Sequence, residues 1–168
     1  LIRALGEVEE LEWVRVMYAY PTHISDAFLA AIAETPKAAK YLDMPLQHAS
    51  RNVLKLMKRG GTRESLEKLI KRVREKIPGI TIRTTFITGF PGETDEDFEE
   101  LMAFVRNCRF DNVGVFTYSD EEGTPAFLLP DKVDAKTARQ RRSRLMKEQA
   151  KISKSLNKAK IGKTFKVL

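Results

Sequence analysis

The sequence has few of the residues from which metal sites and disulfide frameworks are built. Among its 168 residues there is one cysteine, Cys108, and there are two histidines. A single cysteine excludes an internal disulfide and a cysteine metal site, and Cys108 is expected to be a small core residue or a surface thiol. No apolar run approaches the about 20 residues of a membrane-spanning helix, and no signal peptide precedes the first predicted strand. The sequence therefore predicts a soluble protein with no membrane partner, in the cytoplasm by default.

Negative charge is scarce in the last part of the chain. Residues 135–168 contain twelve Lys and Arg residues and one acidic residue, Glu148, so they carry a net charge of +11, whereas residues 1–134 carry −4. Sparse apolar positions predict one long basic helix over residues 135–160. A charge run is usually a solvated helix face, but so one-sided a bias equally favours contact with RNA or a ribonucleoprotein surface.

A strand, a glycine-rich turn and a capped helix follow one another in residues 80–98. β-branched and aromatic residues predict the strand: Ile80, Ile82, Thr84, Phe86 and Ile87. Gly89, Pro91 and Gly92 end it, and Thr94 with Asp97 three residues later is typical of a helix N-terminus. Such a corner is expected to offer free N–H groups to a polar ligand, although any strand-to-helix turn can use the same residues only to turn.

The same pattern occurs four times. Short apolar strands are predicted over residues 13–18, 41–46, 80–88 and 112–118, and they begin about 30 to 40 residues apart, which is the spacing of parallel βα units. Unusual polar groups follow each strand, and in a parallel barrel they would all lie at the carboxyl-end face, where barrel enzymes bind ligands. Four strands cannot close such a barrel. We therefore expect an α/β fold, part of a TIM-like (β/α) barrel, over residues 1–134, and we expect the chain to be a segment of a longer protein.

Three motifs resemble those of radical S-adenosylmethionine methylthiotransferases. They are PLQHAS at residues 45–50, VLK with MKR in residues 53–59, and FITGFPGET at residues 86–94. Two branches share this architecture: the MiaB type, which modifies an adenosine of transfer RNA, and the RimO type, which modifies an aspartate of a small-subunit ribosomal protein. QHAS, RTTF at residues 83–86 and the acidic YSDEEGT at residues 118–124 favour the RimO type. The resemblance covers residues 13 to about 153, and it implies that residues 1–134 are the C-terminal part of a barrel of the radical S-adenosylmethionine type.

The sequence departs from this family in one respect that matters for activity. The family holds an iron–sulfur cluster on a CxxxCxxC loop, and the cluster reductively cleaves S-adenosylmethionine; this chain has no such loop. The ligands of the clusters expected in the full-length protein are thus absent from this chain, and we expect the segment alone to be inactive. Residues 161–168 resemble the first strand of a TRAM-like β domain.

The resemblance also implies which residues contact S-adenosylmethionine. Polar groups near the methionyl and ribose parts would be Gln47, Ser50 and Thr85, and the adenine would lie among Ile87, Gly89, Phe116 and Tyr118. Each has a structural alternative. Ser50 equally fits the N-cap of a helix from Arg51, Ile87 and Phe116 fit a plain core, and His48 fits a satisfied interior group. Glu93 is expected to stabilise a helix start, and no catalytic residue is assigned.

Three acidic residues follow the last predicted strand: Asp120, Glu121 and Glu122. Beside an active site they would repel the phosphates of a nucleic acid and attract a basic protein loop, so they are predicted to bind a ribosomal protein substrate. Two alternatives stay open, namely a transfer RNA methylthiotransferase of the MiaB type and a non-catalytic RNA- or ribosome-binding module.

Overall fold

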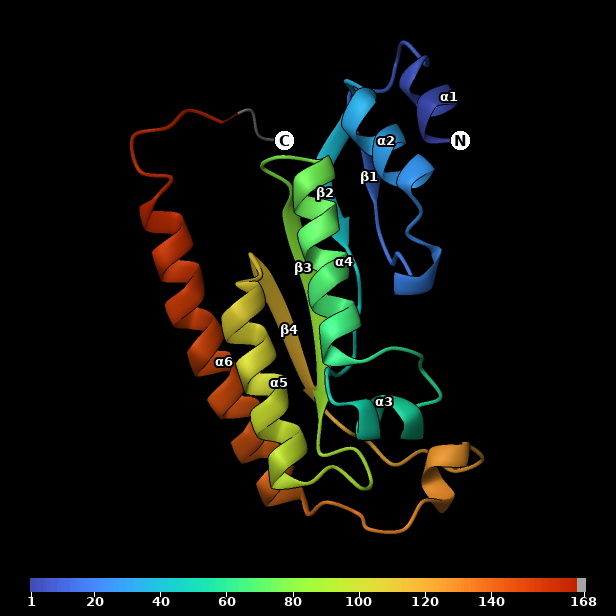
Figure 1. Ribbon diagram of the computed structural model, residues 1–168, viewed down its shortest axis with the longest axis vertical. Helices are drawn as coiled ribbons and strands as arrows, with labels where there is room; N and C mark the ends of the chain where they lie inside the picture. The colour runs from blue at the N-terminus through green and yellow to red at the C-terminus, as the bar shows by residue number, and fades with distance from the viewer. Residues whose placement is uncertain (166–168) are drawn as a thin grey trace.

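A computed structural model describes residues 1–165 and contains one parallel four-stranded sheet (Figure 1). The strands are neighbours in chain order: β1 Val14–Val16, β2 Ala38–Asp43, β3 Thr81–Thr88 and β4 Asn112–Thr117. Parallel neighbours in sequence order need a crossover between each pair. The prediction of a parallel sheet built from βα units is therefore confirmed.

The second strand lies earlier in the chain than predicted. It was expected over residues 41–46, but β2 begins at Ala38 and ends at Asp43. The chain then continues beside β3 irregularly, with hydrogen bonds from the Met44 N–H to Arg83 and from the Gln47 N–H to Thr85. Pro45 lies between them, and because proline has no N–H it cannot donate to the ladder. This irregular pairing explains why the strand ends at Asp43 and not at residue 46, and the earlier start follows from the pairing of Ala38 with Val14 of β1.

Over residues 1–165 there are six α-helices, of which the first precedes β1 and the others connect or follow the strands: α1 Ile2–Gly6, α2 Asp26–Glu34, α3 Arg51–Leu56, α4 Arg63–Lys76, α5 Asp95–Cys108 and α6 Ala135–Lys158. Two short 3₁₀ helices are η1 Pro21–His23 and η2 Pro125–Leu128. Thr94 and Asp97 form the expected reciprocal capping box at the start of α5, which satisfies two backbone donors.

The helices cover one face of the sheet (Figure 1). Even-numbered residues of β3 are buried against them, and odd-numbered residues are only partly buried on the other face. Phe86 of β3 packs edge-on against Phe104 and Phe110 at ring-centroid distances of 6.2 and 6.0 Å. A barrel strand buries one set of residues under the outer helices and directs the other inward. This arrangement is that of a partial barrel.

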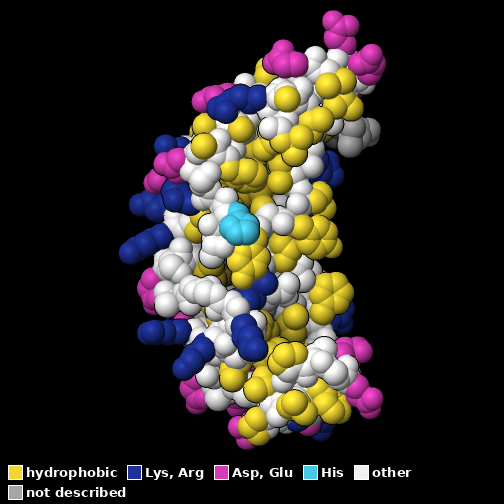
Figure 2. Space-filling view, turned by 90° about the vertical axis from the view of Figure 1, so that its right-hand side faces the viewer, with side chains coloured by type: hydrophobic (Ala, Val, Ile, Leu, Met, Phe, Trp, Pro, Cys, Tyr) yellow, Lys and Arg dark blue, Asp and Glu magenta, His cyan; other side chains and the backbone are white. Residues whose placement is uncertain are grey.

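The uncovered face carries apolar side chains. Phe116 and Tyr18 are 59% and 78% exposed, and Figure 2 shows hydrophobic side chains along the right-hand side, whereas Lys and Arg concentrate on the left. The basic helix α6 packs on β4, β3 and α5. Leu145 and Ile152 of α6 are buried in the core, so one stripe of this helix is structural.

The remaining predictions on chain organisation concern the C-terminal end. Residues 161–165 have turn and irregular backbone, and residues 166–168 of the predicted TRAM-like strand lie outside the described residues. Over the residues that the structure describes, no helix is long and apolar enough to span a membrane.

Candidate functional site

An open groove of about 560 Å³ lies on the uncovered face, at the carboxyl ends of β3 and β4. Six residues predicted from the sequence line it: Gln47, Thr85, Ile87, Phe116, Tyr118 and Glu121. Strand geometry explains why, because Thr85 and Ile87 are alternate residues of β3 and therefore share a face. Ile87 pairs in register with Phe116 of β4. Residues far apart in sequence thus meet in one place.

Gln47 is held in the groove wall by its own backbone. It has a positive φ of 70°, its N–H donates to Thr85 O at 2.8 Å, and its carbonyl accepts from Ile87 N at 2.8 Å. Its side-chain Oε1 is buried and has no hydrogen-bond partner among the described residues. A buried acceptor without a donor is costly, so this oxygen suits a ligand that donates a hydrogen bond.

Aromatic and aliphatic side chains form the rest of the groove. Phe116 is 59% exposed although it lies in a strand, and Ile87 lies beside it in register. The Tyr118 ring packs edge-on against Phe90 at 5.1 Å. Exposed apolar surface of this kind is typical of ligand-binding grooves, and a flat base fits it.

The acidic loop after β4 is partly neutralised. Lys132 forms an ion pair with Asp120, which also accepts a hydrogen bond from the Tyr118 hydroxyl at 2.8 Å. The Lys132 contact lowers the pKa of Asp120, whereas partial burial and the bond to Asp120 raise the pKa of Tyr118 to about 12. Glu121 lines the groove, and Glu122 is exposed. Glu121 and Glu122 therefore supply most of the available negative charge.

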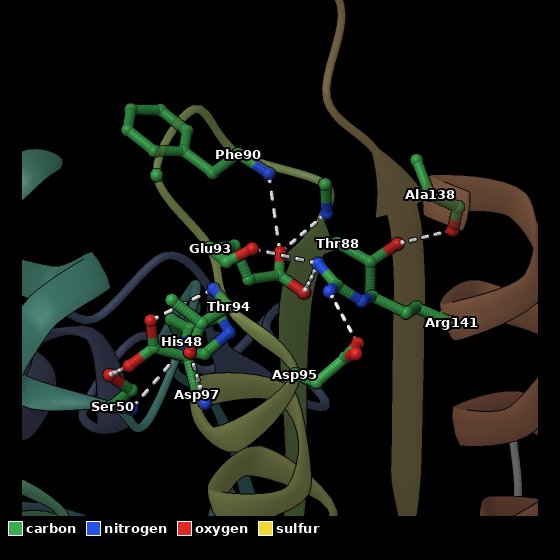
Figure 3. Close-up of polar contacts among 12 residues, drawn as sticks. His48, Ser50, Thr88, Phe90, Glu93, Thr94, Asp95, Asp97, Ala138 and Arg141 are labelled. Carbon is green, nitrogen blue, oxygen red and sulfur yellow. Dashed lines mark hydrogen bonds and ion pairs between the residues drawn. The ribbon is translucent and has the colours of Figure 1, made fainter. Parts of the chain in front are cut away.

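Gly89 is the first predicted cofactor residue that does not line this groove. It has a positive φ of 78°, and a Cβ atom there would lie 2.4 Å from Cβ of Ala138 in α6. Its N–H and that of Phe90 donate to Oε2 of Glu93 (Figure 3). These N–H groups, expected to be free for a ligand, are thus bound within the protein. The structure gives Gly89 a packing role, and its predicted cofactor contact stays a prediction.

Glu93 and Arg141 form a buried ion pair that the sequence did not reveal. Their side chains are 0% and 8% exposed, with 3.1 Å between Arg141 Nη1 and Glu93 Oε1. Arg141 also donates to the Glu93 carbonyl at 3.0 Å and to Asp95 at 2.8 Å (Figure 3). Burial raises the pKa of Glu93, and the charge of Arg141 opposes that rise. Glu93 therefore holds the turn between β3 and α5, rather than only stabilising a helix start as expected.

Ser50 is the second predicted cofactor residue outside the groove. It caps α3 by accepting from Val53 N at 3.5 Å, and its hydroxyl donates to Asp97. His48 accepts from Ser50 N at 3.0 Å through Nδ1, and burial lowers the pKa of His48 to about 4. The helix-cap alternative for Ser50 is confirmed, while its cofactor contact stays a prediction.

The described residues do not fit an iron–sulfur cluster. Cys108, the only cysteine, is buried at the end of α5, and its pKa is raised to about 12 mainly by burial, whereas cluster ligands are thiolates. Over residues 1–165, no three His, Cys, Asp or Glu side chains are grouped as metal ligands.

Comparison with known proteins identifies relatives over the whole chain. Residues 3–105 match the model of the Radical SAM superfamily. The chain is 49% identical to "Ribosomal protein uS12 methylthiotransferase RimO" of Trichlorobacter lovleyi over 168 residues, and 50% identical to the protein of that name from Solibacter usitatus over 170 residues. Each alignment covers 100% of this chain and 37% of the relative. The chain thus spans little more than a third of the length of these curated relatives.

Solved structures of low sequence identity share the fold. Coproporphyrinogen III oxidase (HemN) from Escherichia coli, described as a radical SAM enzyme, superposes with a TM-score of 0.60 at 19% identity, over 85% of this chain and 32% of that one. Elp3 of Methanocaldococcus infernus superposes with a TM-score of 0.56 at 16% identity, over 86% of this chain and 33% of that one. The predicted partial barrel of the radical SAM type is confirmed.

Proposed function

The chain belongs to the radical SAM superfamily, and we propose on that basis that it is part of a methylthiotransferase that modifies an aspartate of a small-subunit ribosomal protein. One observation carries the proposal: residues from three segments that the sequence motifs assign to S-adenosylmethionine line a single groove at the carboxyl ends of parallel strands. That edge is where ligands of α/β barrels bind. The relatives named uS12 methylthiotransferase match the chain over its full length.

The groove fits S-adenosylmethionine by its chemistry. Gln47 Oε1 offers a buried acceptor to an ammonium or hydroxyl group, Thr85 lines the groove, and Ile87 with Phe116 presents an apolar surface to a base. When bound beside a cluster, S-adenosylmethionine would supply the radical chemistry of the reaction. The residues of this chain would orient the cofactor and exclude water, and the cluster ligands would come from elsewhere in the full-length protein.

The charge at the groove supports a protein substrate. Glu121 lines the groove and Glu122 follows it in the exposed loop, so a nucleic acid phosphate would be repelled there. A loop rich in Lys and Arg would be attracted. The exposed basic side chains of α6 lie on the helical side, where they are available to ribosomal RNA. A substrate of this kind places the enzyme with ribosomes in the cytoplasm.

The test is reconstitution of the full-length protein with iron and sulfide under anaerobic conditions. The product of its reaction with S-adenosylmethionine is then identified by mass spectrometry of the ribosomal protein and of transfer RNA in parallel. We expect a methylthio group on one aspartate of the ribosomal protein. Modification of transfer RNA instead would assign the enzyme to the MiaB type, and no modification with an intact cluster would favour a non-catalytic binding module.

A further inference from the structure

Arg83 lies on the uncovered face of β3, inside the groove that holds Thr85 and Phe116. Its Nη1 donates to Oδ1 of Asp43 at 2.8 Å, and Asp43 is fully buried whereas the Arg83 side chain is 34% exposed. A guanidinium has five N–H donors in a fixed fork. Asp43 uses one side of this fork and fixes its orientation, so donors of Arg83 stay available on the groove side.

Gly114 of β4 leaves a notch next to this guanidinium. Gly114 pairs with Thr85 across the sheet. An ideal Cβ there would lie 3.6 Å from Thr85 Oγ1, 3.7 Å from Phe116 Cε2 and 3.9 Å from Arg83 Nη2, all ordinary contact distances. The backbone of Gly114 does not lie in the left-handed region, so neither conformation nor crowding requires glycine. A glycine inside a strand often marks the close approach of a ligand.

We propose that Arg83, Thr85 and the notch at Gly114 form a binding site for a carboxylate, foremost that of the target aspartate. This inference rests on the proposed function and names the group by which the substrate is recognised. Two donors from alternate residues of β3, Arg83 Nη2 and Thr85 Oγ1, both lie close to the position that a Cβ atom of residue 114 would occupy. Arginine binds carboxylates through paired, charge-assisted hydrogen bonds, and a guanidinium held in advance loses little freedom on binding.

The charges around the site are compatible with a carboxylate. Arg83 and Asp43 neutralise each other, so a bound carboxylate adds one negative charge. Glu121 is the other charged residue that lines the groove. It is exposed, so solvent and salt screen its repulsion. The methionyl end of S-adenosylmethionine also has a carboxylate, and the experiment must therefore separate the two sources.

The experiment measures binding in the full-length reconstituted protein. The ligands are S-adenosylmethionine, a peptide carrying the target aspartate, and the same peptide with asparagine at that position. The variants are Arg83→Gln, which removes the charge, and Gly114→Ala, which fills the notch. Arg15→Gln is the matched control, because Arg15 lies on β1 against the Tyr41 ring and away from the groove. Calorimetry gives each dissociation constant independently of turnover.

For Arg83→Gln we expect an about 10- to 100-fold weaker affinity for the aspartate peptide, the size expected for a lost charged hydrogen bond. Gly114→Ala should weaken it in the same direction, and the control should leave it unchanged. The asparagine peptide should bind the parent and the Arg83→Gln variant with equal affinity, because this peptide has no carboxylate for Arg83 to bind. If the affinity for S-adenosylmethionine falls instead, the carboxylate at this site is the methionyl one.

Unchanged affinity for both ligands in both variants would overturn the site. Arg83→Gln leaves Asp43 buried without its partner and can fail to fold; Gly114→Ala keeps that ion pair, so its affinities then decide the question alone. A parent protein that modifies no ribosomal protein refutes the proposed function, whereas the cofactor affinities of the variants still test the carboxylate site.

Discussion

The buried contact between α6 and the turn after β3 allows us to predict how much stability the protein loses when Arg141 is replaced. Replacing Arg141 by Met removes the charge while keeping an apolar stem of similar length, which can still pack beside Phe98. Glu93, which is 0% exposed, is then left with two backbone donors and no counter-charge. Removing one partner of a buried ion pair costs about 3 to 5 kcal/mol, because the remaining charge stays uncompensated.

Arg144→Met is the matched control for this variant. Arg144 lies on the same helix and pairs with Glu99, but these two side chains are 54% and 52% exposed. An exposed pair contributes about 0 to 1 kcal/mol. The free energy of unfolding of each purified protein is obtained from a urea unfolding curve that is monitored by circular dichroism. We expect the Arg141 variant to lose several times more stability than the control.

The loss in the Arg141→Met variant should depend on pH in a defined direction. Burial raises the pKa of Glu93 even with Arg141 present, and removal of that positive charge raises it further. A carboxyl whose pKa is higher in the folded than in the unfolded state binds more protons when folded, so stability falls as pH rises between the two values. Relative to the parent, the deficit should therefore shrink as pH falls from neutral toward the ordinary glutamate value of about 4.5, because the raised pKa lets Glu93 become protonated in the folded variant above that value.

Two results would refute this reasoning. One is an Arg141→Met protein whose free energy of unfolding at neutral pH lies within about 1 kcal/mol of that of the parent, because a buried carboxylate without its partner should destabilise the fold by more than this. The other is a deficit that stays constant or grows toward acidic pH. A Glu93→Gln, Arg141→Met double variant separates the pair from packing, since it should be more stable than Arg141→Met alone.

Three further predictions concern other residues. Gly89→Ala should destabilise the protein by about 2 to 5 kcal/mol in thermal unfolding, because of the positive φ and the overlap with Ala138. Ala138→Gly should restore part of this loss. A Gly89→Ala protein as stable as the parent would contradict the packing role. Since the pKa of His48 is lowered to about 4, the free energy of unfolding should fall by up to about 3 kcal/mol as pH drops from 6.5 to 4. This pH dependence should disappear in His48→Gln. Proton NMR should show no titration of His48 above about pH 5. Reversing Glu121 and Glu122 to Lys should weaken modification of the ribosomal protein, more at low than at high salt, and unaltered modification at low salt would exclude these two carboxylates from substrate binding.

Local sequence signals were sufficient for the secondary structure that surrounds the site. β-branched density predicted β3, and the Thr94 and Asp97 pair predicted the start of α5, because strand propensity and helix capping depend on residues within a few positions of one another. The spacing of the strands was sufficient for a parallel sheet, because each crossover needs a helix-length connection. The carboxyl end of β2 was predicted less well, since Pro45 alters the hydrogen bonding but not the apolar pattern.

The motif residues fell into two groups that the sequence could not separate. Thr85, Ile87 and Phe116 line the groove, whereas Ser50 and Gly89 contact other parts of the protein. Polar and glycine residues after a strand serve caps, turns and ligands alike. Only the packing of neighbouring elements decides which of these roles a given residue has.

The sequence by itself determined the parallel pairing of the strands, the starts of α3 and α5 and the basic character of residues 135–160, because periodicity, caps and charge are properties of neighbouring residues. The tertiary structure alone decided that Arg141 neutralises Glu93, 48 positions earlier, and that Arg83 meets Asp43, 40 positions earlier. Contacts between such distant residues depend on how α6 packs and how β2 and β3 align. A buried charge has no local sequence signal, because an arginine that faces the core and an arginine that faces solvent give the same local sequence pattern in a basic helix.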